Sequence, residues 1–329
     1  MKKIAVIGAG SFGTALALIL EKNGHDVMMY ARNEESIKKM RATGQNKKYL
    51  PNCMIPKTLE LTANKEEVAK FGEIVIFAVP AKAVRQTATE FAPLFSAAQT
   101  IVNVAKGVEH GTYKRLSVVL KECIPQCEVC VLSGPSHAEE VANEIPTTCL
   151  VASENEEIAK MVQQEFMSPR FRLYTNTDII GVEIGAALKN VMAIAAGISD
   201  GLNFGDNTKA AIMTRGIAEM KRLGLAMGGE SETFSGLSGV GDLIVTCTSM
   251  HSRNRRAGIL IGEGKTLAEA EEEIQMVIEG VYTVKVAEEL AKKYKVEMPI
   301  TNAVYTILFE NATASLALLQ LMNRDGKSE

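Results

Sequence analysis

The chain has 329 residues, of which 47% are hydrophobic and 23% charged, and its 36 basic and 39 acidic residues leave a net charge of −3. This profile is that of an ordinary globular enzyme and disfavours a disordered chain or a nucleic acid partner, and the length predicts two domains because one core rarely serves more than about 250–300 residues. An anionic ligand would have to be bound by a local group of donors, since the protein has no overall positive field.

The amino terminus superficially resembles a secretory signal, because Lys2 and Lys3 precede the uncharged run 4–20. Glycines interrupt this run at Gly8, Gly10 and Gly13, at spacings that have another explanation. We also find no later run of 18 or more strongly apolar residues, the length that a membrane span requires. We therefore expect a cytoplasmic protein without a membrane span.

The first predicted elements are a strand, a helix and a second strand. The strand covers Lys3–Ile7, an apolar run that ends at glycine. Ala15, Leu16, Ile19 and Leu20 then recur at helical spacing until Asn23-Gly24, where glycine accepts the left-handed conformation of a helix end. Val27–Tyr30 is predicted as the second strand.

The alternation of strands and helices continues along the first half of the chain. Further strands are predicted at 74–79, 100–105 and 129–132, and 147–152 and 171–174 extend the same sheet. Buried strands separated by helices predict a doubly wound, parallel α/β sheet of the Rossmann type, with ligands at the carboxyl ends of its strands.

The sequence pattern changes near Asp178, where strand-like runs give way to long helical patterns such as 179–200 and 208–223. We therefore predict a dinucleotide-binding domain over 1–180 and an all-helical substrate-binding and catalytic domain over 181–329. Helices should continue through 315–322, and the polar tail 323–329 is predicted to be disordered.

A glycine-rich turn lies between the first strand and the first helix. Gly8, Gly10 and Gly13 fit G-x-G-x-x-G in the strand-to-helix context that the motif requires. Gly8 permits the tight turn, Gly10 lets the backbone approach a pyrophosphate, and Gly13 allows the helix to pack closely on the strand. The helix amino terminus would bind the phosphates. A turn without a ligand is the alternative, and the context favours a dinucleotide.

The end of the second strand bears on the choice between NAD and NADP. An acidic residue there usually binds the adenine ribose when NAD is preferred, but this strand ends with Tyr30-Ala31-Arg32. Ala31 removes the repulsion against a 2′-phosphate, and Arg32 can donate to it. We therefore predict that NADPH is used well; a solvated loop arginine is the alternative for Arg32.

Three cysteines, Cys123, Cys127 and Cys130, form C-x3-C-x2-C, a spacing similar to an iron–sulfur motif. They overlap a predicted strand and lack the aromatic residue usual before the third cysteine. Buried reduced thiols are the favoured interpretation.

Four blocks identify a resemblance to a family, and they occur in the order that the family shows. They are 183–190 (Glu-Ile-Gly-Ala-Ala-Leu-Lys-Asn), 201–208 (Gly-Leu-Asn-Phe-Gly-Asp-Asn-Thr), 238–243 (Ser-Gly-Val-Gly-Asp-Leu) and 252–256 (Ser-Arg-Asn-Arg-Arg). Over nearly its whole length the chain resembles the bacterial NAD(P)-dependent glycerol-3-phosphate dehydrogenases. The resemblance implies reversible hydride transfer between NAD(P)H and dihydroxyacetone phosphate, giving sn-glycerol 3-phosphate for glycerophospholipid synthesis.

The resemblance also implies the catalytic residues. Lys189 corresponds to the acid/base, with Lys106 in the same pocket and Asp242 as the substrate-site aspartate. A protonated lysine can give its proton to the alkoxide that forms at C2. A second lysine nearby would pull the pair toward neutral pH.

Ligand-binding residues carried over from the family divide into two sets. The cofactor set is Gly8, Gly10, Ser11, Phe12, Gly13, Arg32, Lys106, Ala138, Arg253, Val277 and Glu279. The substrate set is Lys106, Gly134, Ser136, Lys189, Asn190, Asp242, Ser252, Arg253 and Asn254. Ser252-Arg253-Asn254 is predicted to open a helix whose amino terminus and Arg253 bind the substrate phosphate, whereas Arg255 and Arg256 fit a solvated face.

Other functions share parts of this pattern. A 3-hydroxyacid or 6-phosphogluconate dehydrogenase would have a similar fold without requiring Ser252-Arg253-Asn254 in this register. A regulator that senses NAD(P) without turnover would not need Lys106, Lys189 and Asp242. The four histidines are scattered, so no metal site is predicted, and His137 is expected only to line the pocket. NAD or NADP is the expected cofactor, and the family default is a homodimer.

Overall fold

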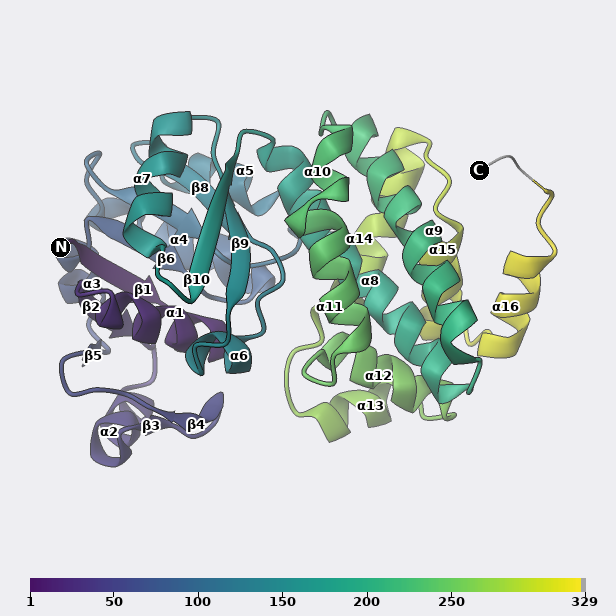
Figure 1. Ribbon diagram of the computed structural model, residues 1–329, viewed down its shortest axis with the longest axis horizontal. Helices are drawn as coiled ribbons and strands as arrows, with labels where there is room; N and C mark the ends of the chain where they lie inside the picture. Colours follow the sequence, from purple (N-terminus) through teal and green to yellow (C-terminus); the bar gives the residue numbers. More distant parts are fainter. Residues whose placement is uncertain (327–329) are drawn as a thin grey trace. The chain divides into compact units, whose positions relative to one another are not determined.

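The computed structural model describes residues 1–326 and divides into two compact units. The first comprises Met1–Glu109 and Lys114–Ile179, and the second comprises His110–Tyr113 and Ile180–Glu329. Figure 1 shows the sheet in the first unit and the helices of the second. The α/β fold followed by a helical region is confirmed.

The sheet of the first unit has eight strands in the order β10-β9-β8-β7-β6-β1-β2-β5. The strands are β1 (Lys3–Ile7), β2 (Asp26–Tyr30), β5 (Glu60–Thr62), β6 (Ile74–Phe77), β7 (Thr100–Asn103), β8 (Glu128–Ser133), β9 (Thr147–Ala152) and β10 (Phe171–Asn176). Chain order reverses between β1 and β6, the topological switch point at which doubly wound sheets bind ligands.

One expectation about the sheet is wrong. The β8–β9 pair is antiparallel, whereas β10 runs parallel to β9, so these last two strands oppose the other six. The connection from β8 to β9 contains only the five-residue helix α6 (Ala138–Ala142), and an antiparallel neighbour needs no crossover helix.

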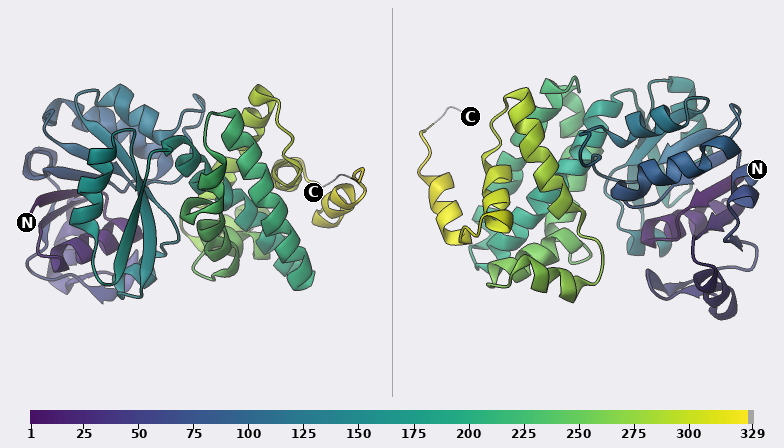
Figure 2. Two further views of the ribbon diagram at one scale, coloured as in Figure 1. Left: turned by 45° about the horizontal axis from the view of Figure 1, so that its top comes forward. Right: turned by 180° about the vertical axis from the view of Figure 1, so that it is seen from behind.

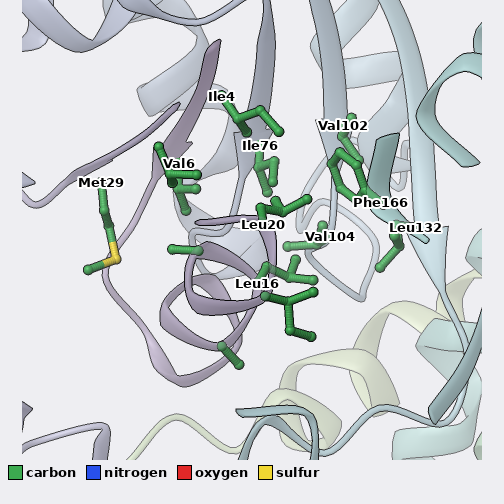
Figure 3. Close-up of a cluster of buried hydrophobic side chains, with 14 of the residues drawn as sticks. Ile4, Val6, Leu16, Leu20, Met29, Ile76, Val102, Val104, Leu132 and Phe166 are labelled. Atoms are coloured by element: carbon green, nitrogen blue, oxygen red, sulfur yellow. The ribbon is translucent and has the colours of Figure 1, made fainter. Parts of the chain in front are cut away.

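Helices cover both faces of the sheet, as the two views in Figure 2 show. Besides α6, the unit contains α1 (Ser11–Lys22), α2 (Glu34–Thr43), α3 (Lys65–Phe71), α4 (Val84–Phe91), α5 (Leu116–Cys123), α7 (Glu156–Phe166) and the 3₁₀ turns η1 (Ala81–Ala83) and η2 (Ala92–Leu94). Figure 3 shows Leu16 and Leu20 of α1 packed beneath strand residues such as Val6 and Ile76. All four side chains are fully buried, so the helix that follows the glycine turn is fixed to the sheet.

A two-stranded hairpin lies outside the main sheet, between β2 and β5. It consists of β3 (Gln45–Asn46) and β4 (Leu50–Met54), which pair antiparallel. The sequence analysis predicted neither these strands nor β5, because each is short and none shows a sustained apolar alternation.

The described part of the second unit consists of helices and the turns between them, apart from the turn His110–Tyr113. Its helices are α8 (Ile179–Gly201), α9 (Gly205–Ala226), α10 (Ser231–Ser235), α11 (Asp242–Thr248), α12 (Arg253–Gly262), α13 (Leu267–Ile274), α14 (Glu279–Tyr294), α15 (Pro299–Phe309) and α16 (Ala314–Met322), and η3 (Leu237–Gly241) is a π-helical turn. Residues 323–326 are irregular, and the predicted disorder of the tail otherwise falls on 327–329, outside the described residues.

Helix α8 corrects the expectation that the chain lacks a long apolar run. Among the described helices it is the one long and apolar enough to cross a membrane by length and composition alone. Almost all of it is buried inside the protein, as in the core helix of a soluble domain. It therefore gives only weak evidence for a span.

Candidate active site

The glycine-rich turn joins the carboxyl end of β1 to the amino terminus of α1. Gly8 has φ +116°, and a Cβ there would lie 2.6 Å from the Ala78 carbonyl oxygen; a Cβ at Gly13 would lie 2.3 Å from the Gly8 carbonyl oxygen. These two glycines are therefore required by the fold itself. A Cβ at Gly10 would meet only the Ala78 oxygen, at 3.9 Å, so the chain alone leaves room for a side chain there.

The amino terminus of α1 fits an anionic ligand. Its N-cap is Gly10, no side chain caps it, and no acidic residue lies in its first turn. Ser11 and Phe12 are half-buried there. Free N–H groups and the helix dipole favour phosphate at such a position. The space beside Gly10 and this uncapped helix end together fit a dinucleotide pyrophosphate.

Other predicted residues lie at the same edge of the sheet. The register aligns Ile7 with Tyr30 and Phe77, and Phe77 with Asn103, so the residues that follow these strands share one edge. Arg32 follows β2 and is exposed. The ion pair of Lys65 and Glu90 lies close enough to interact electrostatically with Arg32.

Lys106 reaches the end of the neighbouring strand. Its Nζ donates to the carbonyl oxygen of Gly134 at 3.0 Å, and the Ser136 hydroxyl donates to the same oxygen at 3.0 Å. Ala138 is the first residue of α6, after His137 in the N-cap position. The structure thus brings Lys106, Gly134 and Ser136 together within the first unit.

The second unit contains a buried ion pair. Lys189 on α8 and Asp242 at the start of α11 are hydrogen-bonded, and they are 6% and 1% exposed. The Lys189 Nζ also donates to the Thr246 hydroxyl at 2.8 Å. Thr246 is a candidate that the sequence analysis missed; its position one helical turn after Asp242, on the same face, was the available signal.

The π-helical turn η3 lies directly before Asp242. It runs through Ser238-Gly239-Val240-Gly241, and the Gly241 N–H donates to the Gly236 carbonyl at 3.1 Å, five residues back. Such turns are concentrated at functional sites in proteins. The turn reorients the chain directly before the aspartate.

Asparagines connect three helices beside the ion pair. The Asn254 Nδ2 donates to the Asn190 Oδ1 at 2.9 Å, and the Asn254 Oδ1 accepts from the Gly280 N–H at 2.8 Å. Both side-chain ends of Asn254 are therefore used, at 8% exposure. These bonds hold α12 and the start of α14 against the helix that carries Lys189.

Helix α12 begins as the sequence predicts. Ser252 is the N-cap, and its side chain accepts from the Arg255 N–H at 3.2 Å. The first turn contains no acidic residue, so its electrostatics suit an anion. Arg253 donates from Nη1 to the Val277 carbonyl at 2.8 Å, and Glu279 opens α14 two residues later.

The interpretation of Arg255 as a solvated residue is wrong. Its Nε and Nη2 donate to Asp200 at 2.8 and 2.7 Å, and its Nη1 donates to the Thr248 carbonyl at 2.8 Å. Lys209 also pairs with Asp200, at 2.6 Å. Both bonds to Asp200 go to its Oδ2, and charge-assisted bonds of this kind are stronger than neutral ones, so together with the Thr248 bond Arg255 fixes the segment between α11 and α12. Arg256 is half-buried, and its Nε is buried without a hydrogen-bond partner.

Helices α8 and α12 touch at their backbones through four glycines. A Cβ would lie 2.1 Å from the Arg255 carbonyl oxygen at Gly197 and 2.2 Å from the Ile194 oxygen at Gly258. Gly201 and Gly262 repeat the contact one turn on, at 2.3 and 2.5 Å from carbonyl oxygens of the facing helix. This close approach sets the distance between Lys189-Asn190 and Ser252-Arg253-Asn254.

The cysteines do not share a site. Cys127 and Cys130 are buried and Cys123 is half-buried, and within residues 1–326 no three His, Cys, Asp or Glu side chains gather as metal ligands do. Burial raises the pKa of the Cys127 and Cys130 thiols. Burial also raises the pKa of Cys247, beside the Lys189 pair, to about 12, which keeps that thiol neutral.

Comparisons with known proteins cover almost the whole chain. Residues 3–159 match the family model described as the NAD-dependent glycerol-3-phosphate dehydrogenase N-terminus, and residues 178–318 match the model of its C-terminus. A glycerol-3-phosphate dehydrogenase [NAD(P)+] of Fusobacterium nucleatum is 52% identical, covering 100% of this chain and 99% of the relative. One of Staphylococcus haemolyticus is 47% identical, with 100% of both covered.

Solved structures agree with these matches. The glycerol-3-phosphate dehydrogenase of Coxiella burnetii is 40% identical, with a TM-score of 0.94 over 98% of this chain and 99% of that one. The Saccharomyces cerevisiae enzyme is 27% identical, with a TM-score of 0.85 and the same coverage. A D-mandelate dehydrogenase at 13% identity and TM-score 0.64 shares the fold alone.

Proposed function

From the fact that the chain belongs to the NAD-dependent glycerol-3-phosphate dehydrogenase family, we propose that it interconverts dihydroxyacetone phosphate and sn-glycerol 3-phosphate with NAD(P)H or NAD(P)+. One observation supports this chemistry above the others: a lysine ammonium is paired with a carboxylate and a hydroxyl inside the helical unit. That group can hold a proton at one place away from bulk water.

The two ligands belong to different domains in this proposal. Residues 1–180 bind the dinucleotide, through the glycine turn and the amino terminus of α1. Residues 181–329 bind the substrate and carry Lys189, Asp242 and Thr246. Lys106 and Lys189 belong to different units, and their sharing of one pocket remains a prediction.

When bound, the reduced dinucleotide supplies the hydride to C2 of the ketone. Lys189 gives a proton to the oxygen that becomes the hydroxyl, because its ammonium is held in place and has a proton to donate. Asp242 and Thr246 hold that ammonium in place through their hydrogen bonds to its Nζ. In the reverse direction Lys189 accepts the hydroxyl proton.

The substrate phosphate is placed at the amino terminus of α12. Ser252, Arg253 and the first N–H groups of the helix supply donors there. Asn190 and Asn254 hold this helix end beside Lys189. The family resemblance assigns Val277 and Glu279 to the nicotinamide end of the cofactor, and the bond from Arg253 to the Val277 carbonyl holds this segment beside the start of α12.

Either dinucleotide fits the adenine end. No acidic residue stands at Tyr30-Ala31-Arg32, and the exposed Arg32 can approach a 2′-phosphate. We include in the proposal a cytoplasmic location, a homodimer and a supply of glycerol 3-phosphate to glycerophospholipid synthesis.

The test is an absorbance assay of NADH and NADPH oxidation with purified protein and dihydroxyacetone phosphate. We expect turnover with both cofactors. Oxidation with 3-oxoacids in place of dihydroxyacetone phosphate would identify a hydroxyacid dehydrogenase instead. Binding of the dinucleotide without turnover at several pH values would identify a sensor.

A further inference from the structure

The hairpin between β2 and β5 makes a direct contact with the glycine-rich turn. Asn46, on β3, is 5% exposed. Its Nδ2 donates at 2.9 Å to the carbonyl oxygen of Ala9 and at 2.9 Å to the hydroxyl of Thr14 on α1. Both amide hydrogens of Asn46 are therefore used, one on the turn that connects β1 to α1 and one on the first turn of α1.

The bond to Ala9 constrains a peptide unit that the proposed function uses. The Ala9 carbonyl and the Gly10 N–H belong to one planar trans peptide, so they point in opposite directions. Since the carbonyl is held toward Asn46, the Gly10 N–H is held away from Asn46. A rotation of this peptide would turn a carbonyl oxygen toward a phosphate bound at α1, where it would repel the anion.

The local sequence restrains the orientation of this peptide only weakly. The peptide turns about ψ of Ala9 and φ of Gly10, and Gly10 lacks the Cβ that restricts φ in other residues. Ala9 and Gly10 are only half-buried. The hydrogen bond from Asn46 therefore fixes the orientation of the Ala9–Gly10 peptide, which glycine by itself does not restrict.

Asn46 is itself held firmly. Gly44, at φ +63°, ends α2 and donates to the Met40 carbonyl at 2.8 Å, and its own carbonyl accepts from the Ile55 N–H at 2.8 Å. Leu50 and Cys53 of β4 are buried in the core cluster that contains Leu16 and Leu20 of α1. The hairpin is thus packed on α1, the helix whose amino-terminal segment Asn46 contacts.

We propose that Asn46 is a positioning residue for the dinucleotide: it holds the Ala9–Gly10 peptide with the Gly10 N–H directed to the pyrophosphate. The inference rests on the proposed function, because it requires the glycine turn to bind a dinucleotide. Asn46 touches no reacting atom. It acts by keeping the binding-competent orientation of the turn populated, and a fall in that population weakens the apparent affinity in proportion.

The test compares Asn46→Leu with Thr14→Val. Leucine has a similar size and no donor, so the variant loses both bonds of Asn46. Thr14→Val loses the Asn46–Thr14 bond and the long Thr14 hydroxyl bond to Met29 Sδ at 3.7 Å, and it keeps the bond to Ala9. Calorimetry with ADP-ribose, which contains the pyrophosphate and no nicotinamide, measures binding without turnover. We expect Asn46→Leu to weaken ADP-ribose about tenfold, as the loss of one hydrogen bond with its orientation implies, and Thr14→Val to weaken it less than twofold.

Binding is measured at a temperature well below the Tm of each variant, so that a loss of stability is not mistaken for a loss of affinity. Asn46→Asp serves as a second variant, since a carboxylate keeps the shape but cannot donate to the Ala9 carbonyl, and it should weaken ADP-ribose at least as much. Equal losses in Asn46→Leu and Thr14→Val, or unchanged affinity in folded Asn46 variants, would overturn the positioning role. Failure of the wild-type chain to bind ADP-ribose, NADH and NADPH would overturn the dinucleotide assignment, and the positioning role with it.

Discussion

The two units differ in where they put charged side chains. In the first unit Asp178, directly before α8, is the one buried Asp, Glu, Lys or Arg, whereas the described part of the helical unit buries Glu183, Lys189, Glu219 and Asp242. The first unit offers its candidate ligand backbone N–H groups and the space beside a glycine. The second offers a buried ammonium paired with a carboxylate.

This difference follows from the role that is proposed for each unit. A dinucleotide carries its own charges, so the protein needs donors and a close approach, which backbone supplies without burying a charge. Proton transfer needs an ionisable group held in place, and a charge is buried at tolerable cost only when it is paired and hydrogen-bonded. The helical unit meets that condition with residues 53 positions apart in the sequence.

The largest effect that would sharpen this comparison is expected at Lys189. Lys189→Met should lower kcat about 10²- to 10⁴-fold, the usual contribution of a positioned acid/base, while NADH binds unchanged in the other unit. Steady-state kinetics and a fluorescence titration with NADH measure the two quantities.

The same variant should lower stability, because it leaves the Asp242 carboxylate buried without its cation, a loss of about 3–5 kcal/mol. Lys209→Met is the matched control, since Lys209 is also ion-paired in this unit but its partner Asp200 keeps Arg255. A Lys189 variant with more than half of the wild-type kcat would contradict the proposal that the buried ion pair of the helical unit carries the proton transfer.

The next effect is expected at the phosphate. Arg253→Ala should raise the KM for dihydroxyacetone phosphate about ten- to a hundredfold, as the loss of charge-assisted hydrogen bonds implies, and should change the dinucleotide Kd much less. Inorganic phosphate should inhibit the wild type competitively and the variant weakly. An unchanged KM would show that the anion is bound elsewhere.

At the adenine end a smaller effect is expected. Arg32→Ala should lower kcat/KM for NADPH about tenfold at low salt and leave NADH nearly unchanged. The effect should shrink as ionic strength rises, because Arg32 is exposed and its charge is screened. Equal losses with both cofactors would assign Arg32 to the adenine or to the fold.

The smallest effect concerns Glu219, whose carboxylate accepts from the N–H groups of Ile300 and Thr301 at the start of α15, at 2.6 and 3.2 Å. Burial raises the pKa of Glu219 above 4.5, and these hydrogen bonds partly offset the rise. The folded state therefore binds this proton more tightly than the unfolded chain does. The contribution of Glu219 to the free energy of unfolding therefore falls as the pH rises from the pKa of Glu219 in the unfolded chain through its pKa in the folded protein.

Glu219→Gln should remove that fall, about 1.4 kcal/mol for each pH unit between the two pKa values. Urea unfolding of wild type and variant from pH 4 to 8 measures it, with the exposed Glu289→Gln as the control. Parallel pH profiles for wild type and Glu219→Gln would contradict the prediction.

The parts that the sequence predicts well are those with a local pattern. The strands at Lys3–Ile7 and Thr147–Ala152 are confirmed to the residue, and the helix start after Ser252 is confirmed by its cap. Strand β5 was missed because three residues, Glu60–Thr62, form a strand only by pairing with β2. The direction of β9 was missed because alternation of strands and helices is equally consistent with both directions.

The candidate site shows the same division. The glycine turn lies within six consecutive residues, so its spacing alone predicts it. Lys189 and Asp242 come from the family resemblance, since no spacing rule connects positions so far apart. A run of arginines such as 255–256 is typical of a surface, and the partners of Arg255, Asp200 at the end of α8 and the Thr248 carbonyl, come beside it only through the fold.

The glycines that join α8 to α12 affect how mutational tolerance in this protein is to be read. Alanine at Gly197 or Gly258 would put a methyl group about 2 Å from a backbone oxygen of the facing helix, and neither backbone can yield as a flexible side chain would. In a complete single-substitution scan these positions should be as intolerant as Lys189, although none is proposed to touch a ligand. If intolerance to substitution alone were used to locate the active site, these glycines would be counted as active-site residues. Assays that measure the yield of folded protein separately from turnover would distinguish the glycines from Lys189.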